Sequence, residues 1–293
     1  MLSAVWRRCP VIGRAVLAGV ALATIGTTPW ALLASLNLKH GSAVPWAVPP
    51  TALYLWLFWR YARGDGWPAS TSQARRANLR ELRLSDDMWA ASLVAGGLGL
   101  VTLVLLFAVV NRLVRLPQQQ SPDLSQIPLV TVASLVLMSA AVAGIVEEVS
   151  FRGYMQRPIE RRHGPVVAIL VTGLVFGFMH FTHPEVTLLL IPYYLTVAAI
   201  YGGLAYLTNS ILPGLLLHAG GNVLAFIDLV ARGRGEWQAS ASPAPLVWEA
   251  GPDASFWVSC VAVLLAAAAT AWAYSALARV PARPQGEGAA RRG

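Results

Sequence analysis

Long apolar runs recur along this chain, and they constrain its fold more than any other feature. Hydropathy predicts about eight of them, each roughly the 20 residues that a helix needs to cross a lipid bilayer. Their predicted bounds are Val11–Leu36, Ala43–Trp59, Trp89–Val110, Ile127–Gln156, Pro165–Phe181, Thr187–Leu207, Ile211–Ala231 and Ser255–Ala278. We therefore predict an all-α, polytopic membrane protein with about eight transmembrane helices.

The distribution of charge predicts how these helices are oriented. Only 12% of the residues are charged, and most of the 22 Lys and Arg residues lie in every second connection, beginning with the N-terminus. By the positive-inside rule both termini are expected in the cytoplasm. The net charge of +8 does not indicate nucleic-acid binding, because no basic face with interleaved aromatic residues is present. The Arg- and Ala-rich composition suggests a bacterial protein of the inner (plasma) membrane, with membrane lipid as its surroundings.

The chain divides into three predicted regions. Residues 1–126 hold the first three spans and a basic cytoplasmic loop, and residues 127–231 hold four spans that carry the polar residues discussed next. Residues 232–293 hold an outer loop, the last span and a tail expected to be disordered. Within the basic loop, Gln73–Leu84 is either an amphipathic helix on anionic lipid or a solvated loop.

Two adjacent carboxylates stand out because they lie at the end of a bilayer-length apolar run. Ionisable groups at membrane depth are costly and usually functional. On a helix, Glu148 and Arg152 are four residues apart and share a face, so they are expected to pair. Glu147 points about 100° away from Glu148, so Arg152 does not neutralise it directly. Pairing accounts for Glu148, whereas Glu147 needs another explanation.

Three later polar residues lie inside apolar spans as well. His180 and Glu147 are about equally far from the turn at His163, roughly 25 Å along the helix axes, so they are expected at one depth. His218 and Asn222 are four residues apart and share a helical face. Each residue alone is explained equally well by a hydrogen bond between packed helices. Four of them at compatible depths favour a common site.

Such a set supports hydrolysis. A carboxylate with a nearby imidazole can orient and deprotonate a water molecule. A second imidazole and a carboxamide can donate hydrogen bonds to the oxyanion that forms at an attacked carbonyl. The sequence shows no serine or cysteine nucleophile with a base at helical spacing, since Ser150 has no histidine so placed.

Three ordered motifs carry a family resemblance. Glu147-Glu148-x-x-x-Arg152-Gly, Phe176-x-x-x-His180 and His218-x-x-x-Asn222 resemble the motifs of the CAAX protease and bacteriocin-processing family, also called CPBP or Abi. The resemblance implies an intramembrane endopeptidase of the glutamic type without a cofactor, with an active-site cavity that opens towards the cytoplasm. It also implies a protein or peptide substrate with a C-terminal or membrane-proximal cleavage site.

The same resemblance assigns roles by motif position. Glu147 would be the general base, assisted by His180, and His218 and Asn222 would stabilise the oxyanion. Glu148 and Arg152 would brace the helices. The family includes proteases that cleave prenylated proteins and members linked to bacteriocin maturation, to immunity or to removal of sorting tails, and the sequence does not choose among these substrates.

Three other functions remain open at this point. Glu147, His180 and His218 are suitable zinc ligands, so a zinc-dependent metalloprotease on the same residues is one alternative. A proton-coupled transporter is another, although inverted repeats with broken helices, which are typical of transporters, are not evident. The third is a non-catalytic immunity or scaffold protein of the membrane, for which an intact polar set would not be required.

Overall fold

The computed structural model describes residues 9–116, 124, 126–182, 188–232 and 244–281. Residues 282–293 of the predicted disordered tail and residues 233–243 of the predicted outer loop lie outside these residues. Within them every regular element is helical, which confirms the all-α class. The α-helices are α2 (Val11–His40), α3 (Val48–Ala62), α4 (Ser72–Leu79), α5 (Asp86–Leu113), α6 (Leu129–Glu147), α7 (Arg157–His163), α8 (Pro165–Met179), α9 (Ile191–Thr208), α10 (Leu212–Arg232), α11 (Val247–Ala250) and α12 (Ala254–Leu277).

Shorter helical pieces complete the chain trace. A nine-residue π-helix, η2, joins α6 to α7 and spans Glu148–Gln156. Three 3₁₀ turns lie at Ala69–Thr71 (η1), His180–Thr182 (η3) and Leu188–Leu190 (η4). Since η2 begins where α6 ends, residues 129–163 form one continuous rod that carries both glutamates.

Each predicted span corresponds to one helix, but not all of these helices are long enough to cross a bilayer alone. Five segments are both long and apolar enough by length and composition, and they are Val11–His40, Asp86–Leu113, Leu129–His163, Leu188–Thr208 and Ala254–Leu277. Both α3 and α8 contain fifteen residues. The described helices thus show a membrane protein with five candidate spans, and a count of eight stays a prediction.

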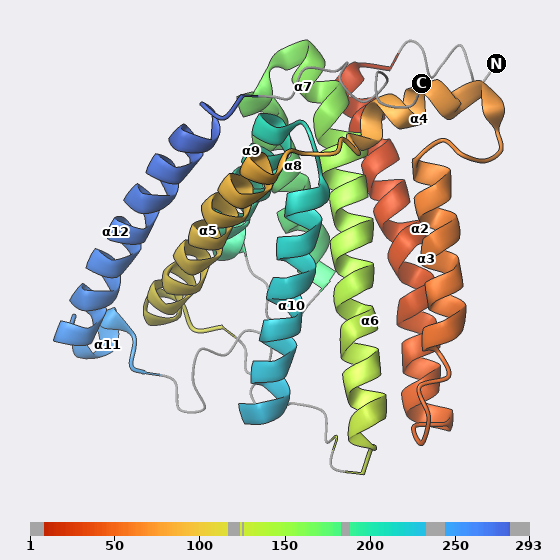
Figure 1. Ribbon diagram of the computed structural model, residues 1–293. Coiled ribbons are helices and arrows are strands. Elements are labelled where there is room, and N and C mark those ends of the chain that lie inside the picture. Colours follow the sequence, from red (N-terminus) through yellow and green to blue (C-terminus); the bar gives the residue numbers. More distant parts are fainter. Residues whose placement is uncertain (1–8, 117–123, 125, 183–187, 233–243, 282–293) are drawn as a thin grey trace.

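The helices form a bundle around the rod of α6 and η2 (Figure 1). Helices α2 and α3 lie on one side of α6, and α10 lies on the other, where α6 and α10 pack together. Helix α12 lies at the far edge and packs mainly on α5. Helices α4 and α7 gather at one end of the bundle, at which α2 begins and α12 ends. We call this the α4–α7 end, and its cytoplasmic location stays a prediction.

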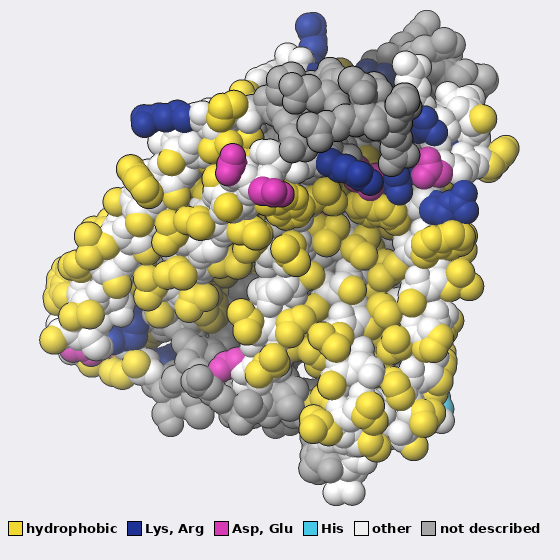
Figure 2. Space-filling view, in the orientation of Figure 1, with side chains coloured by type: hydrophobic (Ala, Val, Ile, Leu, Met, Phe, Trp, Pro, Cys, Tyr) yellow, Lys and Arg dark blue, Asp and Glu magenta, His cyan; other side chains and the backbone are white. Residues whose placement is uncertain are grey.

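The outer surface of the bundle is apolar where a bilayer would contact it. Hydrophobic side chains cover the flanks, and charged side chains gather towards the α4–α7 end (Figure 2). Helix α12 presents the most exposed apolar face, because only 6% of its apolar window is buried. In a bilayer, contact with lipid chains satisfies such a surface.

Two helix contacts bring α10 close to the rod, and both depend on small residues. A Cβ at Gly144 of α6 would lie 3.1 Å from the Leu215 carbonyl oxygen of α10. A Cβ at Gly214 of α10 would lie 2.8 Å from Glu148 Oε2. Larger side chains at these glycines would push α10 away from the glutamates. This close approach lets a side chain from α10 reach the glutamates.

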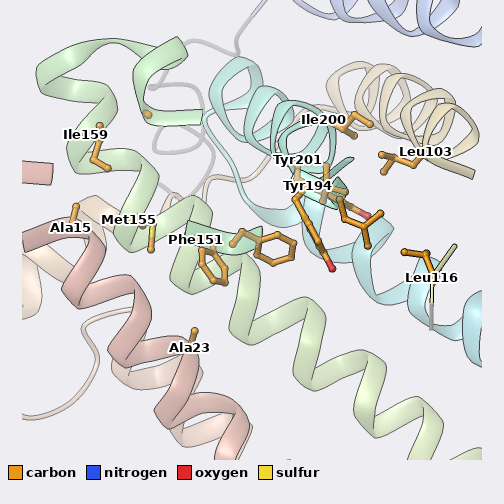
Figure 3. Close-up of a cluster of buried hydrophobic side chains, with 14 residues drawn as sticks. Ala15, Ala23, Leu103, Leu116, Phe151, Met155, Ile159, Tyr194, Ile200 and Tyr201 are labelled. Atoms are coloured by element: carbon orange, nitrogen blue, oxygen red, sulfur yellow. The ribbon is translucent and has the colours of Figure 1, made fainter. Parts of the chain in front are cut away.

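A cluster of buried hydrophobic residues packs beside η2 (Figure 3). Phe151 and Met155 project from η2, Ala15 and Ala23 approach from α2, and Tyr194 comes from α9. The basic segment expected between residues 73 and 84 forms a helix only over Ser72–Leu79. Leu79 there is 1% exposed, so it packs on protein rather than lipid.

Candidate active site

The polar residues of η2 are enclosed by the helices around them. All nine residues of η2 are buried, and they include Glu148, Ser150, Arg152 and Gln156. A π-helix is rare, and where one interrupts an α-helix it frequently marks a functional site. The sequence predicted one uninterrupted helix through Gln156, and the structure adds the change in winding directly after Glu147.

Glu148 is held by two partners. Its Oε1 lies 3.0 Å from Nδ1 of His218, and its Oε2 lies 3.6 Å from Nε of Arg152. The side chain of Glu148 has no exposed surface, and that of Arg152 is 1% exposed. The two residues expected to pair across one helical turn therefore lie within ion-pair distance, away from water.

His218 contacts both glutamates through different ring nitrogens. While Nδ1 faces Glu148, Nε2 lies 3.6 Å from Oε2 of Glu147. The Tyr201 ring of α9 stacks on the imidazole, with centroids 5.1 Å apart and planes inclined by 29°. The imidazole is thus fixed by a carboxylate on one edge and an aromatic ring on one face, so that its second nitrogen points at Glu147.

The two glutamates differ in their access to the surroundings. The Glu147 side chain is 19% exposed, whereas the Glu148 side chain is fully enclosed. Of the two carboxylates, only Glu147 can therefore meet a substrate or a water molecule without a rearrangement of the helices.

His180 lies at the end of α8, in an aromatic environment. Its Nδ1 is 2.8 Å from the Phe176 carbonyl oxygen, and its ring lies 4.9 Å from the Tyr194 ring. The role of His180 beside Glu147 stays a prediction. Asn222 lies one turn beyond His218 on α10 and is half-buried.

An aromatic group connects the His180 region with the glutamates. The Phe176 ring meets the edge of Phe151, with centroids 5.0 Å apart. The Arg152 guanidinium lies over Phe176 at 5.4 Å and over Tyr201 at 5.3 Å, in cation–π geometry. Arg152 therefore bridges the ring beside His180 and the ring that stacks on His218.

Sequence reasoning did not single out Tyr201. An aromatic residue on an apolar helix is indistinguishable in sequence from a packing residue, and Tyr201 has no motif spacing to the other polar residues. Tyr194 of the same helix is likewise buried, beside His180. As for metal ions, no group of three or more His, Cys, Asp or Glu side chains suited to hold one was found in the part of the chain that the structure describes.

Comparison with known proteins adds one finding. Residues 129–224 match the family model described as "Type II CAAX prenyl endopeptidase Rce1-like". This segment contains every residue of the site, from Glu147 to Asn222, and the match confirms the resemblance drawn from the three motifs. No curated protein and no solved structure matched the chain. The matched family implies a protease and suggests an intramembrane endopeptidase similar to CAAX proteases.

Proposed function

We propose that this protein is an intramembrane endopeptidase of the glutamic type, in which Glu147 activates the water that attacks a peptide bond near the membrane. The observation that carries the proposal is the position of His218 between two carboxylates, one enclosed and one accessible. The enclosed carboxylate orients the imidazole, and the accessible one remains for chemistry.

Glu147 acts as the general base in this proposal. It removes a proton from a water molecule as the water oxygen bonds to the carbonyl carbon of the substrate. The same carboxyl group then returns the proton to the departing amine when the carbon–nitrogen bond breaks, so that no external proton is needed. General bases of this kind contribute about 10²–10⁴-fold to the rate. Partial exposure of Glu147 supports this role.

His218 serves as an oxyanion stabiliser that Glu148 positions. A carboxylate on Nδ1 fixes the proton on that nitrogen, as it does for the histidine of serine proteases. With the ring protonated on both nitrogens, Nε2–H donates to the oxyanion. Two carboxylates, the Arg152 guanidinium and an imidazolium together carry no net charge, which supports the cationic form of His218.

His180 and Asn222 complete the proposed mechanism. When Nδ1–H of His180 donates to the Phe176 carbonyl, Nε2 of the neutral ring is an acceptor that can orient the attacking water. The Asn222 carboxamide, one turn along α10 from His218, is the second donor to the oxyanion. Together these four side chains supply the base, the acceptor that positions the water and the two oxyanion donors that hydrolysis requires.

The proposed setting is the inner membrane of a bacterium, with both termini and the opening of the site on the cytoplasmic side. The substrate is a protein or peptide with a C-terminal or membrane-proximal cleavage site. A proteomic comparison of membranes that contain wild type or Glu147→Ala tests the activity. C-terminal fragments that disappear with the variant are expected. Identical fragment sets would favour a non-catalytic immunity or scaffold protein or a transporter.

The proposed enzyme works without zinc. Asn222, on the same face as His218, is a natural oxyanion donor and a poor zinc ligand. The sequence also lacks a His-Glu-x-x-His pair that would fix two ligands on one helix face. We expect purified protein to hold no stoichiometric zinc and to keep its activity in chelator. One zinc per chain, with activity lost to chelator and restored by the metal, would favour a metalloprotease on Glu147, His180 and His218.

A further inference from the structure

A second polar site lies at the α4–α7 end, apart from the glutamates. It is a cavity of about 600 Å³, within the size range of small-molecule sites. Its walls come from the end of α3, from α4 and the loop after it, from α7 and from the turn between α9 and α10. Five arginines line it, namely Arg63, Arg76, Arg80, Arg157 and Arg161.

The carboxylates around this cavity are too few to neutralise the arginines. Asp65 and Glu81 line it, and Glu160 stands behind it, bound to both Arg80 and Arg157. Glu81 lies 2.7 Å from Arg63, and Asp65 lies 3.6 Å from Arg63 and from Arg76. With five arginines against three carboxylates, the cavity retains a net positive charge.

Backbone strain is concentrated at the same place. Arg80 (φ 57°) and Asn209 (φ 49°) line the cavity and are the non-glycine residues with left-handed backbone in the described part of the chain. Asparagine tolerates this conformation, but for arginine it is unfavourable. Strained residues persist where surrounding contacts enforce them, and they gather at ligand-binding sites. Here the backbone of Arg80 turns its side chain into the protein, where the chain contacts Ala205 and Glu160.

Polar atoms at the cavity wall lack protein partners. The Arg80 side chain is 1% exposed, and its Nε is enclosed without a hydrogen-bond partner. The same holds for Nε of Arg157. Buried polar atoms are nearly always satisfied in folded proteins, so these unpaired guanidinium nitrogens are donors that an anion in the cavity can satisfy.

We infer that this cavity binds a phosphate-bearing anion, supplied either by the headgroup of an acidic phospholipid or by a soluble phosphate compound. Guanidinium groups match the geometry of phosphate oxygens and bind them with charge-assisted hydrogen bonds. Arg76 and Arg161 are best placed to close on the anion. The Arg76 side chain is 66% exposed with one ion pair at 3.6 Å, and Arg161 holds one carbonyl oxygen, that of Ala77.

The anion also connects two parts of the fold. Loop residue Arg80 pairs with Glu160 of α7 beside the cavity, and α7 continues directly from the η2 segment that carries Glu148. A bound phosphate would add to this link between the loop and the rod. The inference does not depend on the peptidase activity, because it concerns binding alone.

The test is titration calorimetry of the purified full-length protein in detergent with inorganic phosphate, at constant ionic strength. The double variant Arg76→Gln/Arg161→Gln should bind at least about tenfold more weakly than wild type, the equivalent of one charge-assisted hydrogen bond. The matched control is Arg83→Gln/Arg162→Gln, which removes two exposed arginines from the same end without touching the cavity. It should bind as wild type does.

A second arm identifies the source of the phosphate. Native mass spectrometry of delipidated protein compares added phosphatidylglycerol with phosphatidylcholine, whose choline cation the arginines repel. Retention of phosphatidylglycerol that is lost in the cavity variant assigns a lipid headgroup. Binding of inorganic phosphate alone assigns a soluble compound.

Three results would overturn the inference: no binding of either ligand by wild type, equal weakening in both double variants, or acetate binding as tight as phosphate. The double variant must keep the wild-type elution profile and melting temperature in anion-free buffer. If it does not, Arg76→Gln alone decides the matter, because this side chain makes only a surface ion pair. It should still weaken phosphate binding severalfold, and unchanged binding would refute the site.

Discussion

The segment η2 and the helix α12 of this chain differ sharply in burial and in polarity. All nine residues of η2 are buried although several are polar or charged, whereas only Phe256, Ala273 and Leu277 are buried among the 24 residues of α12. In a water-soluble protein this arrangement would be reversed. In a bilayer an exposed apolar helix costs little, but enclosed charges are expensive. The comparison indicates that η2 exists for function and α12 for anchorage in lipid.

The attachments of α12 fit this division. The Thr270 hydroxyl of α12 lies 2.9 Å from the Thr102 hydroxyl of α5. At the start of α12, Asp253 receives hydrogen bonds from Arg112 of α5, at 2.9 and 3.2 Å. The Tyr274 hydroxyl of α12 also donates to the Ile200 carbonyl oxygen of α9, at 2.7 Å. None of these contacts involves the glutamates.

The largest difference between the two regions should appear in stability. Arg152→Met removes the guanidinium that lies within ion-pair distance of the enclosed Glu148, and breaking a buried ion pair from one side typically costs about 3–5 kcal/mol. Leu264→Ala on α12, where the leucine is 70% exposed, is the control and should cost less than about 0.5 kcal/mol. Thermal melting of both variants in detergent measures this difference. Equal losses of stability in the two variants would contradict the proposed difference between η2 and α12.

A second prediction concerns turnover. Asn222→Ala should lower kcat by about 10²–10³ with a nearly unchanged KM, because the carboxamide acts on the oxyanion and not on the bound substrate. Steady-state kinetics on a membrane-embedded peptide substrate measure both constants. A variant whose defect is confined to KM would reassign Asn222 to substrate positioning.

The smallest effect is expected at the start of α12 and depends on pH. Hydrogen bonds from the Arg112 guanidinium, the Ser255 hydroxyl and the Phe256 amide hold the pKa of Asp253 well below its ordinary value of 3.8. A carboxyl with a lowered pKa contributes stability above its ordinary pKa, and the contribution fades as the pH falls. Asp253→Asn should therefore melt below wild type at neutral pH, with a gap that narrows below pH 3.8. A gap that is constant with pH would exclude this linkage.

The sequence predicts where the helices of this protein lie along the chain better than it predicts how they pack against one another. The apolar runs place the starts of α2 and α8 at Val11 and Pro165, as observed, because length and hydropathy determine which residues enter lipid. They do not determine how many helices cross the bilayer. Helix α8 packs within the bundle although its fifteen residues are fewer than the roughly 20 that a span needs.

The sequence proposes the members of the site, which stay a prediction, but it does not determine their contacts. Helical spacing placed Glu148 with Arg152, which needs only one helix. The contact of His218 with both glutamates depends on how closely α10 approaches α6, and small residues at Gly144 and Gly214 set that distance. Counting residues places His180 level with Glu147, and this equal depth stays a prediction. The count assumes uniform α-helices, whereas η2 winds with more residues per turn.

The most direct test of the central claim compares the two glutamates in one assay. Glu147→Gln and Glu148→Gln are purified, their melting temperatures are recorded, and their hydrolysis of the same membrane-embedded peptide substrate is measured beside wild type. The account predicts that Glu147→Gln melts near wild type and has no activity, whereas Glu148→Gln loses both folded yield and activity. An active Glu147→Gln together with a stable, inactive Glu148→Gln would contradict it and exchange the two roles.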